Sequence, residues 1–390
     1  MDVERARYVT SPDGMRAVTN HADDALGDPL RLQGRLRKAH SAEHASAIAE
    51  QLVLRAKAAE RFGASPLPLY SPDGLEMMTH PLVAARRAAR LVSLGLPVFD
   101  LTAGIGGDLS ACAAAGLACC GLDSDPVAAL IAAKNVPGAA VALGDAGRPP
   151  FDLAAGAVVI DPARRHGARR SADPDAYSPP FELALALLTG ARAGVLKTAP
   201  GMDHALVPPD AEVEFVQVGR SLREAAIWRG GDAVAGLRRA VRVESGAEID
   251  SLAPEADDTP APIGAVLLDP HSCVTRAGLV RHLAHRLDAR LIDPQLGYLT
   301  ASQPAFDPLA ETFTVLEVVD FSVARLRAAL LAGGWRPDEI RRRAFPIEPD
   351  ELRKLLHVRA GRPVTLFCTT VADKRLVVVA KQLVDNCEAG

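Results

Sequence analysis

The sequence of 390 residues is poor in aromatic side chains and has no excess of positive charge. Phe, Trp and Tyr together make up 4% of the residues, so any stacking on nucleobases would depend on a few individual rings. Lys and Arg number 44 against 48 Asp and Glu, for a net charge of −4. This balance excludes a uniformly basic nucleic-acid coat, although it allows a local basic patch.

Paired cysteines and long apolar runs are also missing. The six cysteines form no C-x-x-C pair, which argues against a zinc ribbon or a thioredoxin-like motif. The N-terminus has no apolar leader segment, and no run approaches the roughly 18 apolar residues of a membrane span. We therefore expect a cytoplasmic protein without membrane contact, and its length suggests two or three domains at roughly 100–200 residues each.

Residues 1–92 have the pattern of a helical N-terminal domain. Ser41 can cap a helix whose apolar residues recur at steps of three and four until Gly63. A Pro-rich turn follows, and a second helix is expected over residues 81–94.

Between residues 93 and 245, short apolar runs alternate with helical segments, which indicates βαβ units and a parallel sheet. Four of the five runs end in an aspartate: Asp100, Asp123, Asp145 and Asp161. Ligands bind outside the carboxyl ends of parallel strands. One such aspartate could simply cap a helix or a turn, but four in register favour a ligand site.

The rest of the chain predicts a linker and a second α/β region. Residues 246–264 are acidic and Pro-rich, which is typical of a linker or a long surface loop. In residues 265–390 we expect helices over 276–287, 322–332 and 349–358, and strands over 313–319, 341–347, 363–371 and 375–380. This region also concentrates basic residues, namely Arg341, Arg342, Arg343, Arg353, Lys354, Arg359 and Arg362.

A Gly-rich turn follows the first strand and reads DLTAGIGGD from Asp100 to Asp108. A dinucleotide fingerprint would need a third glycine where Leu109 stands, and Asp100 would face a pyrophosphate. S-adenosylmethionine (SAM) fits the charges better, because its ammonium can pair with Asp100 and its carboxylate can accept N–H groups at the helix start. Asp123 could then accept hydrogen bonds from the ribose hydroxyls, and Asp145 could accept one from the adenine amino group.

These motifs resemble a known family. DLTAGIGGD, GLDSDP, GDA and VVIDPARR look like class I SAM-dependent methyltransferases, and the segment around Thr79 resembles trimethylguanosine-synthase-like enzymes. Almost the whole chain resembles the actinobacterial class I methyltransferases with a C-terminal THUMP-like domain. The resemblance implies an α/β fold with a Rossmann-like sheet, a helical N-terminal domain and a small α/β THUMP-like domain. The expected cofactor-binding residues are Thr79, Asp100, Thr102, Gly104, Gly106, Gly107, Asp108, Asp123, Asp145 and Ala146.

The target side of the site is expected at Asp161-Pro162-Ala163-Arg164. Amino-methyltransferases carry Asn/Asp-Pro-Pro-aromatic at this place, and uracil-C5 enzymes carry Asp-Pro-Pro-Arg with a cysteine nucleophile after the next strand. Here that later position reads Lys197-Thr198-Ala199-Pro200, so covalent C5 chemistry is not expected. Direct in-line transfer remains, with Asp161 and Arg164 as catalytic residues. Substrate contacts are expected from Arg165, Arg169, Arg170, Tyr177, Phe181 and Lys197, the arginines on phosphates and the two rings on a flipped base.

The expected function is methylation of a base of structured RNA, with RNA as the partner and no protein partner implied. Two alternatives stay open: a catalytically silent RNA-binding protein on the same fold, and a methyltransferase for small molecules or proteins. No metal is expected, because Asp269, His271, Cys273, His282 and His285 lack a recognised ligand spacing.

Overall fold

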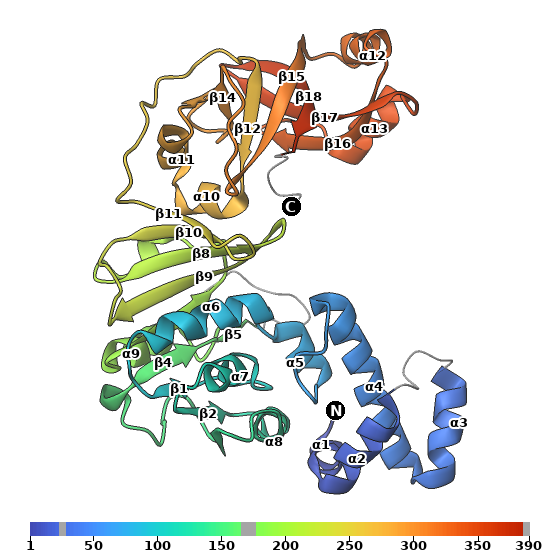
Figure 1. Ribbon diagram of the computed structural model, residues 1–390, viewed down its shortest axis with the longest axis vertical. Coiled ribbons are helices and arrows are strands. Elements are labelled where there is room, and N and C mark those ends of the chain that lie inside the picture. The colour runs from blue at the N-terminus through green and yellow to red at the C-terminus, as the bar shows by residue number, and fades with distance from the viewer. Residues whose placement is uncertain (23–28, 165–176, 385–390) are drawn as a thin grey trace. The chain divides into compact units, whose positions relative to one another are not determined.

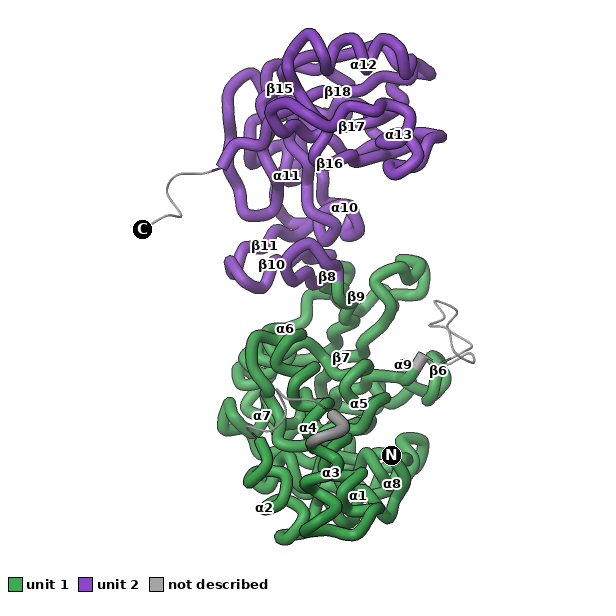
Figure 2. The backbone as a smooth tube through the Cα atoms, turned by 90° about the vertical axis from the view of Figure 1, so that its right-hand side faces the viewer, with its two compact units in different colours: residues 1–214, 223–236 green, residues 215–222, 237–390 purple. Residues whose placement is uncertain are grey.

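The computed structural model describes residues 1–22, 29–164 and 177–384. The chain divides into two compact units, which are coloured separately in Figure 2. The first comprises residues 1–214 and 223–236, and the second comprises residues 215–222 and 237–390. These boundaries differ from the expected ones at residues 92, 245 and 264.

The first unit is built on a parallel sheet, as the alternating sequence pattern predicts (Figure 1). In spatial order its parallel strands in the described part of the chain are β3 (Ala140–Leu143), β2 (Cys119–Asp123), β1 (Val98–Asp100), β4 (Ala157–Ile160) and β7 (Ala193–Thr198). β9 (Ser221–Gly230) pairs antiparallel with β7. Because the five parallel strands share one direction, their carboxyl ends meet at one edge of the sheet.

Helices and a short ladder connect these strands. They are α7 (Gly107–Ala114) after β1, α8 (Pro126–Asn135) after β2, the 3₁₀ turn η2 (Leu153–Ala155) before β4, the two-stranded ladder of β5 (Ala163–Arg164) and β6 (Tyr177–Ser178) after β4, α9 (Phe181–Gly190) before β7, and η4 (His204–Leu206) after β7. These crossovers are what a parallel sheet requires.

The N-terminal helices share an apolar cluster with this sheet unit. Val9 and Leu54 are buried in the same apolar cluster as Ile105 of the Gly-rich loop and Ile131 of α8. As predicted, Ser41 caps its helix by accepting the N–H of His44 at 3.2 Å. The helices are α1 (Val3–Thr10), α2 (Pro12–Asn20), α3 (Pro29–Ala39), α4 (Ala42–Phe62), α5 (Pro72–Met77) and α6 (Pro81–Val92).

The second unit holds an antiparallel ladder and a mixed sheet. β8 (Glu212–Val218) leads into the unit, and β10 (Arg238–Arg242) pairs antiparallel with β11 (Ala247–Asp250). The second sheet, within the described residues, follows the order β13 (Arg290–Leu291), β14 (Leu299–Ala301), β12 (Val266–Pro270), β15 (Ala310–Asp320), β18 (Lys374–Leu383), β17 (Arg362–Val371) and β16 (Trp335–Arg343). Its helices are α10 (Ser272–Ala277), α11 (Val280–Arg286), α12 (Val323–Ala332) and α13 (Pro349–Leu356).

Three sequence expectations for the second unit need correction. The expected linker contains strand β11, because residues 247–250 complete a ladder with β10. The single helix expected over 276–287 is two helices, since Gly278 adopts a left-handed φ of 68° that ends α10. The strand expected over 341–347 ends at Arg343, because Ala344 has a φ of 50°.

Asn135 ties the segment before α5 to the Gly-rich loop. Its side chain is 8% exposed. Its amide nitrogen donates to the carbonyl oxygens of Leu69 at 2.9 Å and Ile105 at 2.8 Å, and its amide oxygen accepts the N–H of Leu69 at 2.9 Å. These bonds satisfy buried backbone groups that come from segments far apart in the sequence.

We predict that Asn135→Ala lowers the free energy of unfolding by about 1–3 kcal/mol, because it leaves buried backbone groups without partners. Urea denaturation followed by far-UV circular dichroism measures this change. Asn20→Ala, at an exposed position, is the matched control and should stay within about 0.5 kcal/mol of the wild type. Equal stability of the two variants would contradict the role given to Asn135.

Candidate cofactor and methyl-transfer site

Three of the four predicted aspartates lie directly at the carboxyl edge of the parallel sheet. Asp100 is the last residue of β1, Asp123 is the last residue of β2, and Asp161 follows β4. The strand register pairs Asp100 with Gly121 on one side and Val159 on the other, so Asp123 and Asp161 each stand two residues beyond the level of Asp100. Asp145 lies two residues beyond the end of β3, and it is exposed.

The Gly-rich loop between β1 and α7 depends on glycine backbone conformations. Gly104 and Gly106 have φ values of 56° and 89°, which side chains rarely tolerate. A Cβ on Gly107 would lie 2.8 Å from Cγ of Met78. The N–H of Gly104 donates to Asp123 Oδ2 at 2.7 Å, so the loop is fixed to the end of β2. Helix α7 begins directly after this loop, with Gly106 as its N-cap, and the first N–H groups of a helix can bind an anion.

Asp100 is almost completely buried, at 3% exposure. Its Oδ1 accepts the N–H of Thr102 at 3.2 Å. Burial, together with the nearby negative charge of Asp108, raises the pKa of Asp100 well above its ordinary value. A buried carboxyl group of this kind is suited to a cationic ligand, because the ligand's charge stabilises the ionised form.

The neighbouring strand ends offer more acceptors. Burial raises the pKa of Asp123, although N–H donors from Asp125 and Gly104 oppose the shift. Asp145 accepts the N–H of Gly147 at 2.8 Å, and Ala146 is buried beside it. Sequence reasoning expected these residues around the ribose and adenine of SAM.

Behind the strand ends lies a buried ionic network. Arg87 of α6 contacts the carboxylates of Asp108 and Glu224. The Thr79 hydroxyl donates to Asp108 Oδ2 at 2.5 Å, and Lys197 Nζ donates to Thr79 Oγ1 at 2.6 Å. Arg87 and Lys197 lower the pKa of Asp108 against the opposing effect of its burial. Asp108 and Thr79, both expected at the cofactor, thus form part of the network that supports the crevice.

Sequence reasoning missed Arg87 and Glu224. A signal for Arg87 exists, since it stands on the apolar face of α6 between Val83 and Leu91, at helical spacing. Glu224 carries no comparable signal, because its partner Arg87 lies 137 residues away in the chain.

The Lys197 ammonium lies against the Asp161 carboxylate, and its side chain is 8% exposed. This position differs from the expected substrate contact: the ammonium faces the interior network. The N–H of Asp161 donates to Thr102 Oγ1 at 2.6 Å, which joins the target segment to the Gly-rich loop. The Asp161 carboxylate keeps 30% exposure and is the part of the pair that a substrate can reach.

Tyr177 and Phe181 are buried, at 5% and 7% exposure, which corrects their expected role as open stacking faces. The rings contact each other edge to face at 6.2 Å, and the Tyr177 hydroxyl accepts the N–H of Ala199 at 3.2 Å. They hold the segment after β6 against the end of β7. The backbone of Arg164 lies in β5, opposite Tyr177. Arg165, Arg169 and Arg170 lie outside the described residues.

The three consecutive arginines Arg341, Arg342 and Arg343 form ion pairs within the second unit. Arg341 contacts Asp269 at 2.6 Å, Arg343 contacts the same carboxylate at 2.7 Å, and Arg342 contacts Glu348. The Arg343 guanidinium also stacks on Tyr298, 4.1 Å from the ring centroid. A basic run in the sequence is therefore a set of ion pairs in space, which reduces its expected contribution to binding phosphates.

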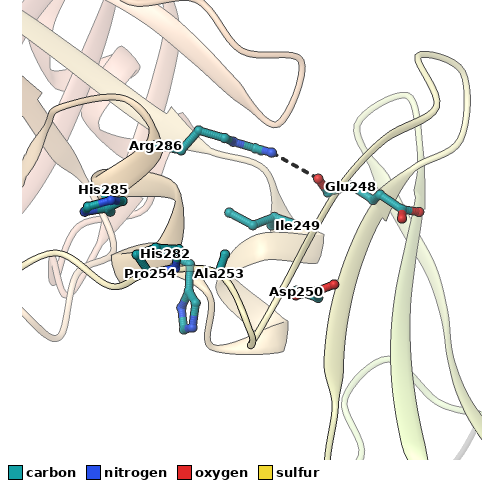
Figure 3. A pocket seen from close by; sticks show the side chains of 8 residues that line it. All are labelled: Glu248, Ile249, Asp250, Ala253, Pro254, His282, His285 and Arg286. Carbon is teal, nitrogen blue, oxygen red and sulfur yellow. Dashed lines mark hydrogen bonds between the residues drawn. The ribbon is translucent and has the colours of Figure 1, made fainter. Parts of the chain in front are cut away.

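The residues weighed as metal ligands occupy separate places in the second unit. Asp269 lies between the two arginines just described, while His282 and His285 lie on α11. Among the described residues, no group of three His, Cys, Asp or Glu side chains is arranged to hold a metal ion. A cavity of about 400 Å³ borders α11 and β11 (Figure 3). It is lined by Glu248, Ile249, Asp250, Ala253, Pro254, His282, His285 and Arg286.

A parallel sheet with a Gly-rich loop after its first strand and carboxylates at its strand ends is typical of the Rossmann-like SAM-dependent methyltransferases. The donor set fits SAM, because the buried Asp100 carboxyl matches a cationic group and the start of α7 matches a carboxylate.

The comparisons with known proteins agree. An S-adenosylmethionine-dependent methyltransferase of Mycobacterium tuberculosis (strain CDC 1551 / Oshkosh), itself uncharacterized, is 33% identical over 349 residues. The match covers 86% of this chain and 95% of that protein, and the H37Rv strain has a counterpart with the same values. The chain belongs to this family of SAM-dependent methyltransferases, and its cofactor is SAM.

A solved structure and two family models are also similar to this chain. A protein of Porphyromonas gingivalis W83 that is assigned to the methyltransferases has a crystal structure with a TM-score of 0.77. It is 22% identical, and the alignment covers 96% of this chain and 99% of that chain, which shows a shared fold. A THUMP domain-like family model matches residues 310–382, and a model described as a domain of unknown function matches residues 2–58. No described helix is long and apolar enough to cross a membrane.

We predict that SAM binding weakens as the pH falls through the raised pKa of Asp100. In the free protein this carboxyl holds its proton to a higher pH than an ordinary aspartate, whereas the cofactor's ammonium favours the ionised form. Affinity is therefore present above that pKa and is lost below it, by up to about tenfold per pH unit.

Isothermal titration calorimetry of SAM at several pH values measures this dependence. Asp100→Asn should bind SAM more weakly and with a flatter pH profile. Asp152→Asn, at an exposed aspartate before β4, should follow the wild type. A wild-type profile in the Asp100 variant would remove Asp100 from the cofactor site.

Proposed function

We propose that this methyltransferase acts on a base of structured RNA, transferring the methyl group directly from cofactor to acceptor. Support on the RNA side comes from the THUMP domain-like match over residues 310–382, since the family resemblance implies an RNA-binding role for that domain. Support on the chemical side comes from Asp161, whose partly exposed carboxylate follows β4 and whose N–H is bonded to Thr102 of the cofactor loop.

That hydrogen bond is the observation that carries the proposal, because it links the target segment and the cofactor loop at adjacent strand ends. SAM supplies a methyl group on a positively charged sulfur. The protein's own task is then to position the acceptor in line with that methyl group. Asp161 accepts a hydrogen bond from the acceptor group, and Arg164, Arg165, Arg169 and Arg170 contact phosphates of the RNA strand.

Support against covalent chemistry comes from the residues after β7. A C5 mechanism needs a cysteine nucleophile there, whereas the chain has Ala199 and Pro200. The cysteines that the structure buries in the first unit, Cys112 and Cys119, have raised pKa values caused by burial, so they are poor nucleophiles.

We predict that wild-type protein transfers tritium from methyl-labelled SAM to cellular RNA and that Asp161→Ala abolishes this transfer while SAM binding is largely retained. The loss is expected because the acceptor is no longer held in line. Asp152→Ala should transfer label as the wild type does, since this exposed residue lies before β4 and away from its carboxyl end. Scintillation counting after RNase or protease treatment measures the transfer.

Each outcome separates the proposal from its rivals. Label that RNase releases supports RNA as the substrate. Label that survives RNase and is released by protease would indicate a protein substrate. Wild-type protein that binds SAM and RNA but transfers no label would indicate a catalytically silent RNA-binding protein.

A further inference from the structure

Lys197 is a buried cation placed at the edge of the methyl-transfer site. It is the penultimate residue of β7, one strand away from the end of β4. Its ammonium contacts the carboxylate of Asp161 and donates to Thr79 Oγ1 at 2.6 Å. Charged side chains are rarely this buried unless their charge is matched by a partner.

The surrounding charges make Asp161 the principal partner of Lys197. Asp108 and Glu224 lie farther from its ammonium, at 3.8 and 3.9 Å. Both of these carboxylates are already in contact with Arg87. Lys197 is thus left to balance the one carboxylate that opens toward the substrate.

The same arrangement keeps Lys197 protonated. Burial alone would lower its pKa, but Asp161, Asp108 and Glu224 together raise it above the ordinary value. A lysine in this state donates hydrogen bonds and cannot remove a proton from a substrate.

Resting on the proposed function, we propose that Lys197 is a positioning residue that fixes the Asp161 carboxylate against the acceptor, and that the acceptor is an uncharged nitrogen of a base and not a hydroxyl. Thr79, which accepts from Lys197 and donates to Asp108, fixes the ammonium in turn.

The choice of nitrogen follows from the proton balance. A neutral nitrogen attacks with its lone pair: the N–C bond forms, the C–S bond breaks, and the bonding pair stays on the cofactor's sulfur. The methylated nitrogen then carries the positive charge and releases its proton to water. A hydroxyl would have to lose its proton as it reacts, and a carboxylate already bound to an ammonium is a weak acceptor for it. A protonated amine has no free lone pair.

Wild-type protein gives the first test, which needs no variant. RNA labelled from tritiated SAM is hydrolysed in alkali, which cuts after every nucleotide whose ribose 2′-hydroxyl is free. Label in mononucleotides is expected for a methylated base. Label in alkali-resistant dinucleotides would place the methyl group on a ribose oxygen and overturn the inference while leaving RNA as the substrate. Label absent from RNA would instead overturn the proposed function, and the inference with it.

The second test separates positioning from a merely structural role. Lys197→Met is expected to lower kcat by about 100-fold, the scale for a misplaced reacting group, with a small change in KM. Lys197→Arg keeps a cation beside Asp161 and is expected to recover at least a tenth of wild-type kcat. Lys57→Met, at an exposed position of α4, is the matched control.

Readouts other than turnover accompany each variant. Calorimetry is expected to give both Lys197 variants a SAM affinity within a few-fold of the wild type. Circular dichroism is expected to show both variants folded at the assay temperature, with a lower melting temperature for Lys197→Met because it breaks a buried ion pair. Loss of SAM binding or folding in parallel with kcat, in both variants, would show a structural role and overturn the positioning role. Wild-type kcat in Lys197→Met would overturn it as well.

Discussion

The contact between Arg87 and the carboxylates of Asp108 and Glu224 holds the walls of the site together. Each of these side chains is less than one-tenth exposed, so removing any one would leave a buried charge without its partner. The three residues come from α6, α7 and β9, which are elements far apart in the sequence. Lys197 extends the same network to Asp161. Cofactor loop and target segment are therefore positioned by one set of matched charges.

Burying these charged side chains costs free energy of desolvation. The position of the network beside the site explains why that cost is tolerated. Replacing the charges by apolar groups could stabilise the fold, but it would remove the fixed carboxylates on which the chemistry depends. Asp100 carries the clearest sign of this compromise. Its raised pKa shows that an ionised carboxyl is unfavourable there in the free protein. A cationic group bound beside Asp100 would relieve that penalty, because its charge favours the ionised carboxylate.

Local patterns were enough to predict the sheet and its strand-end acceptors. Asp100 and Asp123 could be placed because each directly follows an apolar run, and parallel strands carry such residues to one edge. Arg87 could not be paired from the sequence, because Glu224 lies far along the chain. The burial of Tyr177 was equally hidden, since it depends on a hydrogen bond from Ala199 across the fold. The sequence pattern merged α10 and α11 into one helix, because the break between them depends on the single residue Gly278. It missed β11, because that strand depends on pairing with β10.

The net charge of −4 says little about the field outside the protein, because many arginines form ion pairs with carboxylates inside it. Arg341 and Arg343 share Asp269, and Arg87 is enclosed by carboxylates, so much of the positive charge in the described chain is balanced internally. Counting arginines along the sequence therefore overstates the field available to attract phosphates. A surface for the proposed RNA substrate would have to come from cations that lack such partners. Under that proposal, binding would depend on the placement of a few residues and not on the overall charge of the protein.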